Sequence, residues 1–265
     1  MKLFEYEAKK ILAEYGIPTP GGELAINAKQ AREIASKLKP PFAVKAQVLV
    51  AGRGKAGGIV FANSAEEAEK IAGKLIGIQI KGMPVKSVGL EEKLNVKREI
   101  YFGITIDRFK RSYVAIASVF GGMKIEEVAQ KKPESIVKTF LSPQQGLKPY
   151  KARQIAKRIG YSGDQLVALG KIFERLYSVC MDYDAELIEM NPLVETFDGN
   201  FVVADARIIV DDNALFRHPE YKKRLFEDES EHSPQELEAL KKGLAYVKLD
   251  GNIGVIGNGA GLVMA

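Results

Sequence analysis

The sequence contains one cysteine, Cys180, and two histidines, His218 and His232, among 265 residues. A single thiol cannot form an internal disulfide, and it offers no cysteine cluster for a metal ion. We expect Cys180 to be packed as apolar volume inside a helix rather than to be catalytic. Both histidines lie in polar segments, so we expect them to be ordinary surface residues.

Several classes of protein are excluded by motifs that the sequence lacks. No apolar run approaches the ~20 residues of a membrane-spanning helix. The N-terminal MKLFEYEAKK predicts a charged amphipathic helix without the core of a signal peptide, so we expect a cytoplasmic protein. The absence of GxxxxGK[ST] excludes a Walker-type phosphate loop. The net charge of +5 is spread over lysines and arginines that alternate with glutamates, so the expected ligands are small anions, with no nucleic acid and no membrane.

The hydrophobic fraction of 46% is ample for a packed core in one large domain or two smaller ones. Helical and strand-like patterns are mixed, which predicts an α/β (α+β) fold with hairpins. The predicted helices cover residues 4–15, 27–38, 64–75, 151–159 and 164–182, and a last one begins at Ser233. The predicted strands cover residues 42–45, 59–62, 85–92, 99–107 and 112–119, followed by a hairpin over 186–210 that turns at Asp198–Gly199.

A glycine-rich segment, AGRGKAGG at 51–58, contains Gly52, Gly54 and Gly57 at the GxGxxG spacing. This spacing alone is a weak signal, because glycine serves many kinds of loop. In a dinucleotide-binding unit the loop opens a helix, but here the β-branched and aromatic residues 59–62 follow it. The segment therefore predicts a flap between two strands, with Lys45 on the incoming strand and backbone N–H groups facing phosphates.

A second group of polar residues lies on the predicted hairpin over 186–210. Glu189 and Asn191 are two residues apart, so their side chains leave the same face, and the turn brings Asn191 opposite Asp205. Such oxygen donors suit a Mg²⁺ ion that keeps some waters and bridges phosphates. The alternative is structural: Asn191–Pro192 ends or bulges a strand, and Asp205 pairs with Arg207 or a lysine.

The last residues, YVKLDGNIGVIGNGAGLVMA at 246–265, predict a strand, a glycine turn and the first turn of a helix. A βα unit without a second strand cannot bury both of its faces. We therefore expect a chain that ends just inside a further domain.

With these residues in view, the chain resembles the β subunits of succinate–CoA ligase, the ADP- or GDP-forming enzymes of the ATP-grasp superfamily. The resemblance runs from end to end, through LFEYEAKKILAEYGIP, GRGKAGG, the Glu-x-Asn-Pro-Leu strand, the ALFR segment and DGNIG…NGAGL. It implies an ATP-grasp domain over 1–243 made of two α/β subdomains, with the flap-bearing subdomain at about 20–98. Residues 244–265 would begin a truncated, flavodoxin-like CoA-ligase domain with its first strand.

The resemblance also implies a role for individual residues. Contacts to nucleotide phosphates would come from Lys45, Gly52, Arg53 and Gly54, and contacts to the base and ribose from Glu91, Leu94 and Glu99. Asn191 and Asp205 would hold Mg²⁺. Glu189 would orient a phosphohistidine carried by a partner α subunit, and Asn258 would contact the organic acid.

The implied reaction is succinyl-CoA + phosphate + NDP in equilibrium with succinate + CoA + NTP, where the nucleotide is ATP/ADP or GTP/GDP. The partner is the CoA-binding α subunit, in an αβ or α2β2 assembly. Two alternatives stay open. The first is a β subunit of malate–CoA ligase or of an ADP-forming acetate–CoA ligase, and the second is a non-catalytic scaffold subunit.

Overall fold

The computed structural model describes residues 1–221 and 233–264, so His232 lies outside the described residues. The chain divides into two compact units, Met1–His218 and Pro219–Ala265. The domain boundary expected at 243/244 stays a prediction. Among the described residues, no helix is both long and apolar enough to cross a bilayer.

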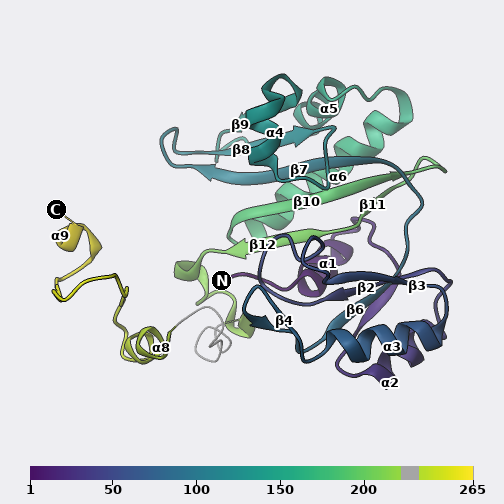
Figure 1. Ribbon diagram of the computed structural model, residues 1–265. Helices are drawn as coiled ribbons and strands as arrows, with labels where there is room; N and C mark the ends of the chain where they lie inside the picture. The colour runs from purple at the N-terminus through teal and green to yellow at the C-terminus, as the bar shows by residue number, and fades with distance from the viewer. Residues whose placement is uncertain (222–232, 265) are drawn as a thin grey trace. The chain divides into compact units, whose positions relative to one another are not determined.

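The first unit contains a smaller lobe built on a four-stranded antiparallel sheet in the order β1-β6-β2-β3. Two helices lie along one face of this sheet, as Figure 1 shows. The elements are β1 (Gly22–Ala25), α2 (Ala28–Ala35), β2 (Phe42–Ala46), β3 (Ile59–Ala62), α3 (Ala65–Leu75) and β6 (Val88–Glu92), with a small hairpin of β4 (Gln79–Ile80) and β5 (Met83–Pro84).

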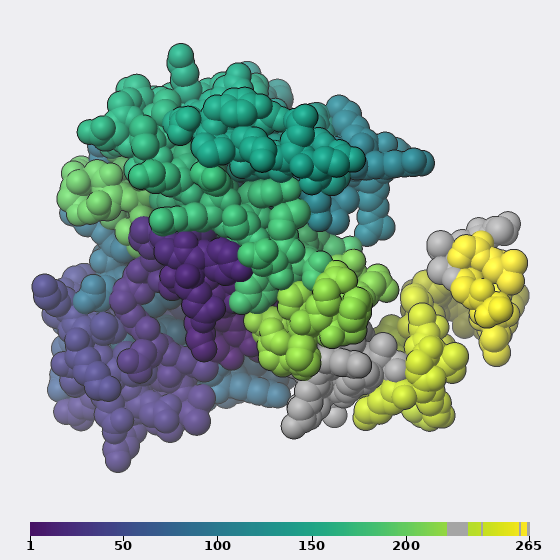
Figure 2. Space-filling model, turned by 180° about the vertical axis from the view of Figure 1, so that it is seen from behind, coloured from purple at the N-terminus to yellow at the C-terminus, as the bar shows by residue number. Residues whose placement is uncertain are grey.

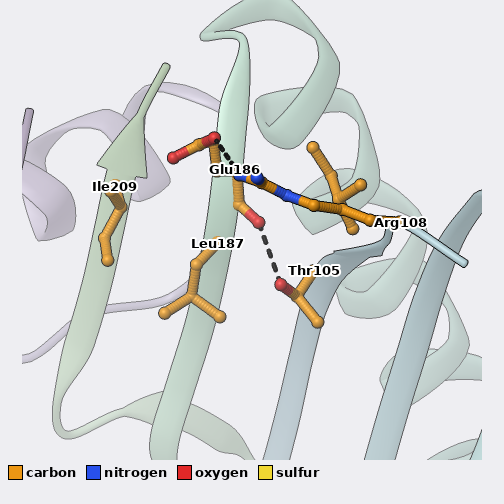
Figure 3. Close-up of a pocket in the computed structure, with 6 residues that line it drawn as sticks. Thr105, Arg108, Glu186, Leu187 and Ile209 are labelled. Atoms are coloured by element: carbon orange, nitrogen blue, oxygen red, sulfur yellow. Dashed lines mark hydrogen bonds and ion pairs between the residues drawn. The ribbon is translucent and has the colours of Figure 1, made fainter. Parts of the chain in front are cut away.

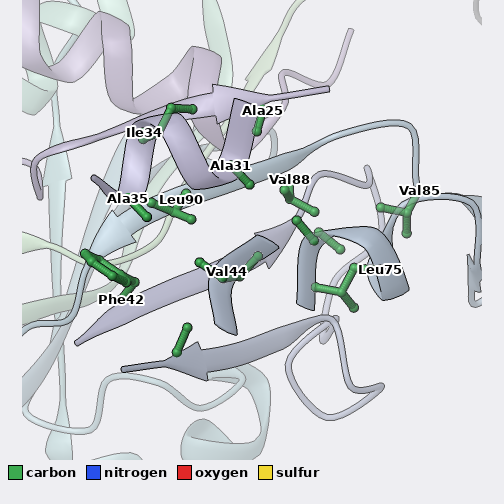
Figure 4. Packing of buried hydrophobic residues seen from close by; sticks show 14 of the residues in the cluster. Ala25, Ala31, Ile34, Ala35, Phe42, Val44, Leu75, Val85, Val88 and Leu90 are labelled. Carbon is green, nitrogen blue, oxygen red and sulfur yellow. The ribbon is translucent and has the colours of Figure 1, made fainter. Parts of the chain in front are cut away.

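Apolar side chains between this sheet and its two helices form the core of the lobe. In Figure 4, Phe42, Val44 and Leu90 of the strands lie among side chains of α2 and α3, including Ile34 and Leu75. Each large apolar side chain buried in this way contributes ~1.5–3 kcal/mol of transfer free energy. This core holds β2 as a rigid strand, and the strand carries Lys45.

Helix α3 begins where the sequence predicted it to begin. The Ser64 hydroxyl accepts a hydrogen bond from the Glu67 backbone N–H at 3.2 Å, which satisfies one of the free donors of the first turn.

The larger lobe is built on a six-stranded antiparallel sheet in the order β11-β10-β7-β8-β9, with β12 pairing β10. Helix α6 packs against β7 and β10, where the rings of Phe102 and Phe173 stack at 3.7 Å between centroids. The elements are β7 (Val96–Asp107), β8 (Ser112–Ser118), α4 (Ile125–Lys131), η1 (Pro133–Ser135), β9 (Ile136–Leu141), α5 (Pro149–Arg158), α6 (Gly163–Asp182), β10 (Ala185–Thr196), β11 (Phe201–Val203), β12 (Ala206–Val210) and η2 (Asp212–Ala214).

Helix α1 (Glu5–Glu14) contacts β12 and α6 of the larger lobe. In the space-filling view from behind, this N-terminal segment, in dark purple, lies between the two lobes (Figure 2). The amphipathic helix predicted for residues 4–15 is thus confirmed, with Ala8, Ile11 and Leu12 buried.

The buried packing predicted for Cys180 is also confirmed. Its side chain is fully buried in α6, and Sγ lies 3.5 Å from the Ala185 carbonyl oxygen. Burial raises the pKa of the thiol to about 12, so the reactive thiolate is disfavoured at neutral pH.

The second unit carries α8 (Pro234–Lys241) and α9 (Ala260–Met264) in its described residues. The helix predicted to begin at Ser233 is confirmed, with Ser233 accepting from the Glu236 backbone N–H at 3.2 Å. The strand predicted at the start of 246–265 is wrong, because the described part of that segment contains no strand. Its apolar residues Ile253, Val255 and Ile256 are exposed, and β-branched residues form a strand only where another strand can pair with them.

Candidate active site

A cleft of about 970 Å³ lies in the first unit and takes its lining from both lobes. Every residue that the sequence singled out in this unit for nucleotide, metal or phosphohistidine contact lines it. These are Lys45, Gly52, Arg53, Gly54, Glu91, Leu94, Glu99, Glu189, Asn191 and Asp205. Residues separated by up to 160 positions in the sequence therefore meet in one hollow.

Lys45 projects from the fully buried strand β2, and its side chain is only 9% exposed. Its ammonium lies 2.7 Å from Glu91 Oε2 and 3.1 Å from Glu5 Oε1, and it donates to the Ala204 carbonyl at 2.6 Å. Burial alone would lower the pKa of Lys45, but the charges of Glu5 and Glu91 raise it above its ordinary value. The group is therefore a permanent positive charge in the cleft.

The glycine-rich segment joins β2 to β3, which pair antiparallel, so the predicted flap between two strands is confirmed. Two hydrogen bonds close the base of the flap, from Ala46 N to the Gly58 carbonyl at 2.7 Å and from Gly58 N to the Arg53 carbonyl at 2.8 Å. Gly52 has φ +74°, a conformation that a side chain would strain. The chain can turn tightly here and keep its backbone N–H groups accessible.

Arg53 is buried, with a side chain 7% exposed, although residues 51, 52 and 54–57 of the flap are exposed. One guanidinium nitrogen donates to the Ala46 carbonyl at 3.0 Å. The other donates to Glu5 and lies 3.4 Å from Asp205 Oδ1. The Arg53 side chain therefore points from the flap toward the floor of the cleft, where it lies beside Lys45.

Asn191 and Asp205 lie side by side, because the Asn191 N–H donates to the Asp205 carbonyl at 2.9 Å. The Asn191 side chain is fixed by the Gly122 N–H, which donates to Oδ1 at 2.8 Å, and by its own Nδ2, which donates to the Met123 carbonyl. The predicted hairpin is confirmed, with its turn at residues 197–199. The structural alternative is correct in its first half, because the pairing of β10 with β7 is irregular between Met190 and Leu193, across Asn191–Pro192. Its second half paired Asp205 with Arg207 or a lysine, whereas the ion pair found for Asp205 among the described residues is with Arg53.

The electrostatics of Asp205 fit a divalent cation. Burial and the negative charge of Glu5 raise the pKa of Asp205 to about 6, although Arg53 and Lys45 oppose the rise. A carboxylate whose charge is incompletely compensated gains from a cation, and the Asn191 amide oxygen keeps a second lone pair. In the described ranges no group of three or more His, Cys, Asp or Glu forms a metal cage. The two oxygen donors thus suit Mg²⁺ whose other ligands are water and phosphate.

The three residues assigned to the base and ribose do not share one environment. Glu91 is bound by Lys9 and Lys45, at 2.6 and 2.7 Å, and so lies at the lysine end of the cleft. Leu94 and Glu99 line the cleft without those contacts. Burial raises the pKa of Glu99, whose carboxylate faces Gly122 closely enough that an added Cβ there would lie 2.6 Å from it.

Glu189 faces the cleft from β10, between β7 and β12. It accepts a hydrogen bond from the Tyr101 hydroxyl at 2.9 Å. Burial raises the pKa of Glu189, and the Tyr101 hydrogen bond and the charge of Arg207 counteract part of the rise.

Sequence reasoning missed Glu5 and Lys9 of α1. They are four residues apart, so they share one helix face, and both side chains are buried, with Glu5 lining the cleft and Lys9 lying beside it in an ion pair with Glu5. The sequence could have indicated these two residues, because the charged side chains of EYEAK lie next to the apolar face of the helix. We name Glu5, Lys9, Lys45, Arg53, Glu91 and Asp205 the charge cluster.

Two further residues that the sequence singled out are His218, which is not among the residues that line the cleft, and Asn258, which belongs to the second unit. The surface prediction for His218 is wrong: it is 7% exposed, stacks on Tyr183 at 5.7 Å and lies 2.9 Å from Asp184 Oδ2. The polar residues around His218 in the sequence suggested an exposed position, but the partly exposed carboxylate of Asp184 pairs with the buried imidazole. Asn258 is exposed in the second unit, and its role stays a prediction.

A second hollow, of about 240 Å³, lies where β7, β10 and β12 run side by side (Figure 3). None of the predicted site residues lines it. Arg108 and Glu186 form an ion pair across it at 3.4 Å, and both are exposed, so the pair contributes little free energy.

Comparisons with known proteins agree with this geometry. Residues 2–195 match the model of the ATP-grasp domain family. The whole chain is 47% identical to the succinate–CoA ligase [ADP-forming] β subunit of Pyrobaculum calidifontis and 48% identical to the [GDP-forming] β subunit of Thermus thermophilus. It covers 70% and 69% of those relatives.

Solved structures share the fold at low sequence identity. A dinucleotide-forming acetyl-coenzyme A synthetase of Ca. Korarchaeum cryptofilum aligns with a TM-score of 0.65 at 18% identity, over 79% of this chain and 93% of that one. ATP citrate lyase of Methanothrix soehngenii gives 0.65 at 19% identity, over 91% of this chain and 59% of that one. The predicted ATP-grasp fold is confirmed.

Proposed function

The chain belongs to the family of succinate–CoA ligase β subunits with an ATP-grasp domain, and we propose that its cleft binds a Mg²⁺-nucleotide for acid–CoA ligation. The proposed reaction is succinyl-CoA + phosphate + NDP in equilibrium with succinate + CoA + NTP. The observation that carries the proposal is the meeting of Lys45 and Arg53 with Asn191 and Asp205 in one cleft. Cations for phosphate thus adjoin oxygen donors for the metal.

The residues of this chain would act mainly by position and charge. Phosphoryl transfer needs the phosphates held in line and their charge neutralised. Lys45, Arg53 and the N–H groups of the flap would hold the phosphates, and Leu94 and Glu99 the base and ribose. Mg²⁺ on Asn191 and Asp205 would supply further neutralisation of phosphate charge.

The phosphoryl group would pass to a histidine of the CoA-binding α subunit, in an αβ or α2β2 assembly. His218 is bound to Asp184 and is not among the residues that line the cleft, so it does not suit this role. Glu189 faces the cleft and would orient the incoming imidazole through its carboxylate. Asn258 is the proposed contact to the organic acid, and the cytoplasm is the proposed location.

The organic acid that the enzyme ligates has more than one candidate. Malate–CoA ligases and ADP-forming acetate–CoA ligases use a similar subunit, so malate and acetate are the alternative acids. A panel of succinate, malate and acetate, assayed with the α subunit present, separates these candidates.

The proposal is tested by thermal unfolding of the chain with ADP or GDP, with Mg²⁺ or with EDTA. A nucleotide at ~100 times its Kd should stabilise the fold by ~2.7 kcal/mol, and the preferred base should do so at lower concentration. Greater stabilisation with Mg²⁺ than with EDTA supports the metal assignment. No stabilisation by either nucleotide would overturn the proposal in favour of a scaffold subunit.

A further inference from the structure

The charge cluster contains as many carboxylates as cations. Lys9, Lys45 and Arg53 carry three positive charges, and Glu5, Glu91 and Asp205 carry three negative charges when ionised. The cations that would attract phosphate are therefore neutralised by side chains of the same chain. A free polyphosphate that approaches the charge cluster therefore meets a net charge near zero instead of a strongly positive group.

Glu5 is the member that links the cations. Its Oε1 lies 2.9 Å from Lys9 Nζ and 3.1 Å from Lys45 Nζ, while Oε2 accepts from Arg53. The side chain is only 3% exposed. One carboxylate thus fixes the strand lysine and the flap arginine relative to each other, from a helix that packs on the other lobe.

Stability does not explain this arrangement. Buried ion pairs lose about as much in desolvation as they gain in attraction, and apolar replacements of similar volume are often neutral or stabilising. Burial alone would raise the pKa of Glu5, yet the charges of Lys9, Lys45 and Arg53 hold it well below its usual value. The fold therefore keeps a negative charge where the ligand's negative charge is to bind.

We propose that Glu5 is a positioning residue that makes the cleft select polyphosphate carrying a divalent cation over free polyphosphate. The inference rests on the proposed function. Mg²⁺ removes about two negative charges from ADP, so the complex is repelled less by Glu5, Glu91 and Asp205 than the free nucleotide is. The preference is set by the charge of the whole cluster, including Lys9, which does not line the cleft.

The measured quantity is a selectivity ratio, the Kd of ADP in EDTA divided by the Kd of ADP with saturating Mg²⁺, obtained by calorimetric titration at pH 8. In Glu5→Gln the cluster gains one unit of positive charge, and the ratio should fall by about tenfold or more, since the two ligand forms differ by about two charges. In Lys9→Met the cluster loses one unit of positive charge, and the selectivity ratio should rise by a similar factor.

Two further variants separate charge from packing. Glu5→Asp keeps the charge but shortens the side chain, so it should weaken both affinities and leave the ratio within about twofold of wild type. Glu14→Gln removes a carboxylate from an exposed position on the same helix and should change neither affinity. Circular dichroism and thermal unfolding establish that each variant is folded.

Opposite shifts in Glu5→Gln and Lys9→Met support the inference, because misfolding would lower both affinities in both variants. Equal weakening of both ligand forms, with the ratio unchanged, would overturn it and leave Glu5 a packing residue. If Glu5→Gln does not fold, the direction of the ratio in Lys9→Met decides. Wild-type chain that binds neither form of ADP would refute the proposed function itself, before any variant is compared.

Discussion

The hydroxyl of Tyr101 reaches across the sheet to Glu189 and donates a hydrogen bond of 2.9 Å to Oε2. Gly103 makes this reach possible. It follows Tyr101 by two residues on the same face of β7, and it lies directly opposite Glu189. A Cβ at Gly103 would be 2.6 Å from the tyrosine oxygen and 3.1 Å from Glu189 Cβ. The ring therefore lies over a position without a side chain and holds the carboxylate toward the cleft.

We expect Tyr101→Phe to slow phosphorylation of the partner's histidine by about tenfold or more. The variant removes a hydrogen bond to a buried carboxylate, a loss of ~1–3 kcal/mol, and lets Glu189 leave its orientation. ADP affinity should stay within about twofold, because Lys45 and Arg53 are unchanged. Labelling from γ-³²P nucleotide with the α subunit present measures the first effect, and titration calorimetry the second.

The chain offers a matched control for this variant, whose carboxylate partner lies on β10, the strand that carries Glu189. Tyr161 donates a hydroxyl hydrogen bond of 2.8 Å to Glu195, and neither residue lines the cleft. Tyr161→Phe should lower stability by a similar amount and leave the phosphorylation rate unchanged. Equal loss of rate in both variants would mean that Tyr101 acts through general stability and not through Glu189.

Asp205 should make the folded state less stable as the pH rises. Its pKa is about 6 in the folded chain and ~3.9 in an unfolded one, because burial and Glu5 disfavour the charged form. The folded state therefore binds this proton more tightly, and the stabilising contribution is complete below pH ~4 and lost as the pH rises through about 6.

Asp205→Asn cannot ionise, so at pH 8, without nucleotide or metal, we expect it to be about 1 kcal/mol more stable than wild type. This figure discounts the pKa shift for a side chain that is 39% exposed. The advantage should shrink by pH 5 and vanish near pH 4. Thermal unfolding across this pH range measures it, and a constant difference would contradict the assignment. Saturating Mg-ADP should reverse the order at pH 8, since only wild type keeps the charged oxygen donor.

Much of the site's local structure could be predicted from the sequence, because its signals are local. The glycine spacing followed by β-branched residues gave a flap between strands, and the two-residue spacing of Glu189 and Asn191 gave a shared face. The charge cluster could not be predicted in this way. Lys9 and Glu91 are 82 positions apart, and only the packing of α1 brings them together.

The elements missed in the fold have a similar cause. Helix α4 and strand β9 are seven and six residues long, with Pro133 between them, too short for a clear period. The strand expected near residue 246 had the right composition, but strand formation requires a pairing partner, and composition does not reveal one.

His218 should be structural and carry no phosphate. Asp184 accepts from Arg217 at 2.6 and 2.9 Å and lies 2.9 Å from His218, so this group holds the end of the first unit. We expect His218→Phe to retain the stack on Tyr183 but to lose about 1 kcal/mol of stability, with ADP affinity unchanged. Acid-labile phosphate recovered on a peptide of this chain that contains His218, after turnover with the α subunit, would refute this prediction.

Lys45→Met should weaken ADP binding by about tenfold to a hundredfold both with Mg²⁺ and in EDTA, and more strongly in EDTA, because the ammonium acts on phosphate directly and a charge-assisted hydrogen bond contributes ~1.5–3 kcal/mol. Methionine preserves most of the apolar stem in the buried strand β2, and Lys9 and Arg53 still pair with the carboxylates that Lys45 leaves, so the fold should persist with lower stability. Lys74→Met removes the same charge from an exposed position on α3, outside the cleft, and should leave binding unchanged. Titration calorimetry on the three proteins gives the comparison. If Lys45→Met and Lys74→Met bind metal-free ADP equally well, Lys45 does not contact phosphate, and the cation at the floor of the cleft must be Arg53 alone.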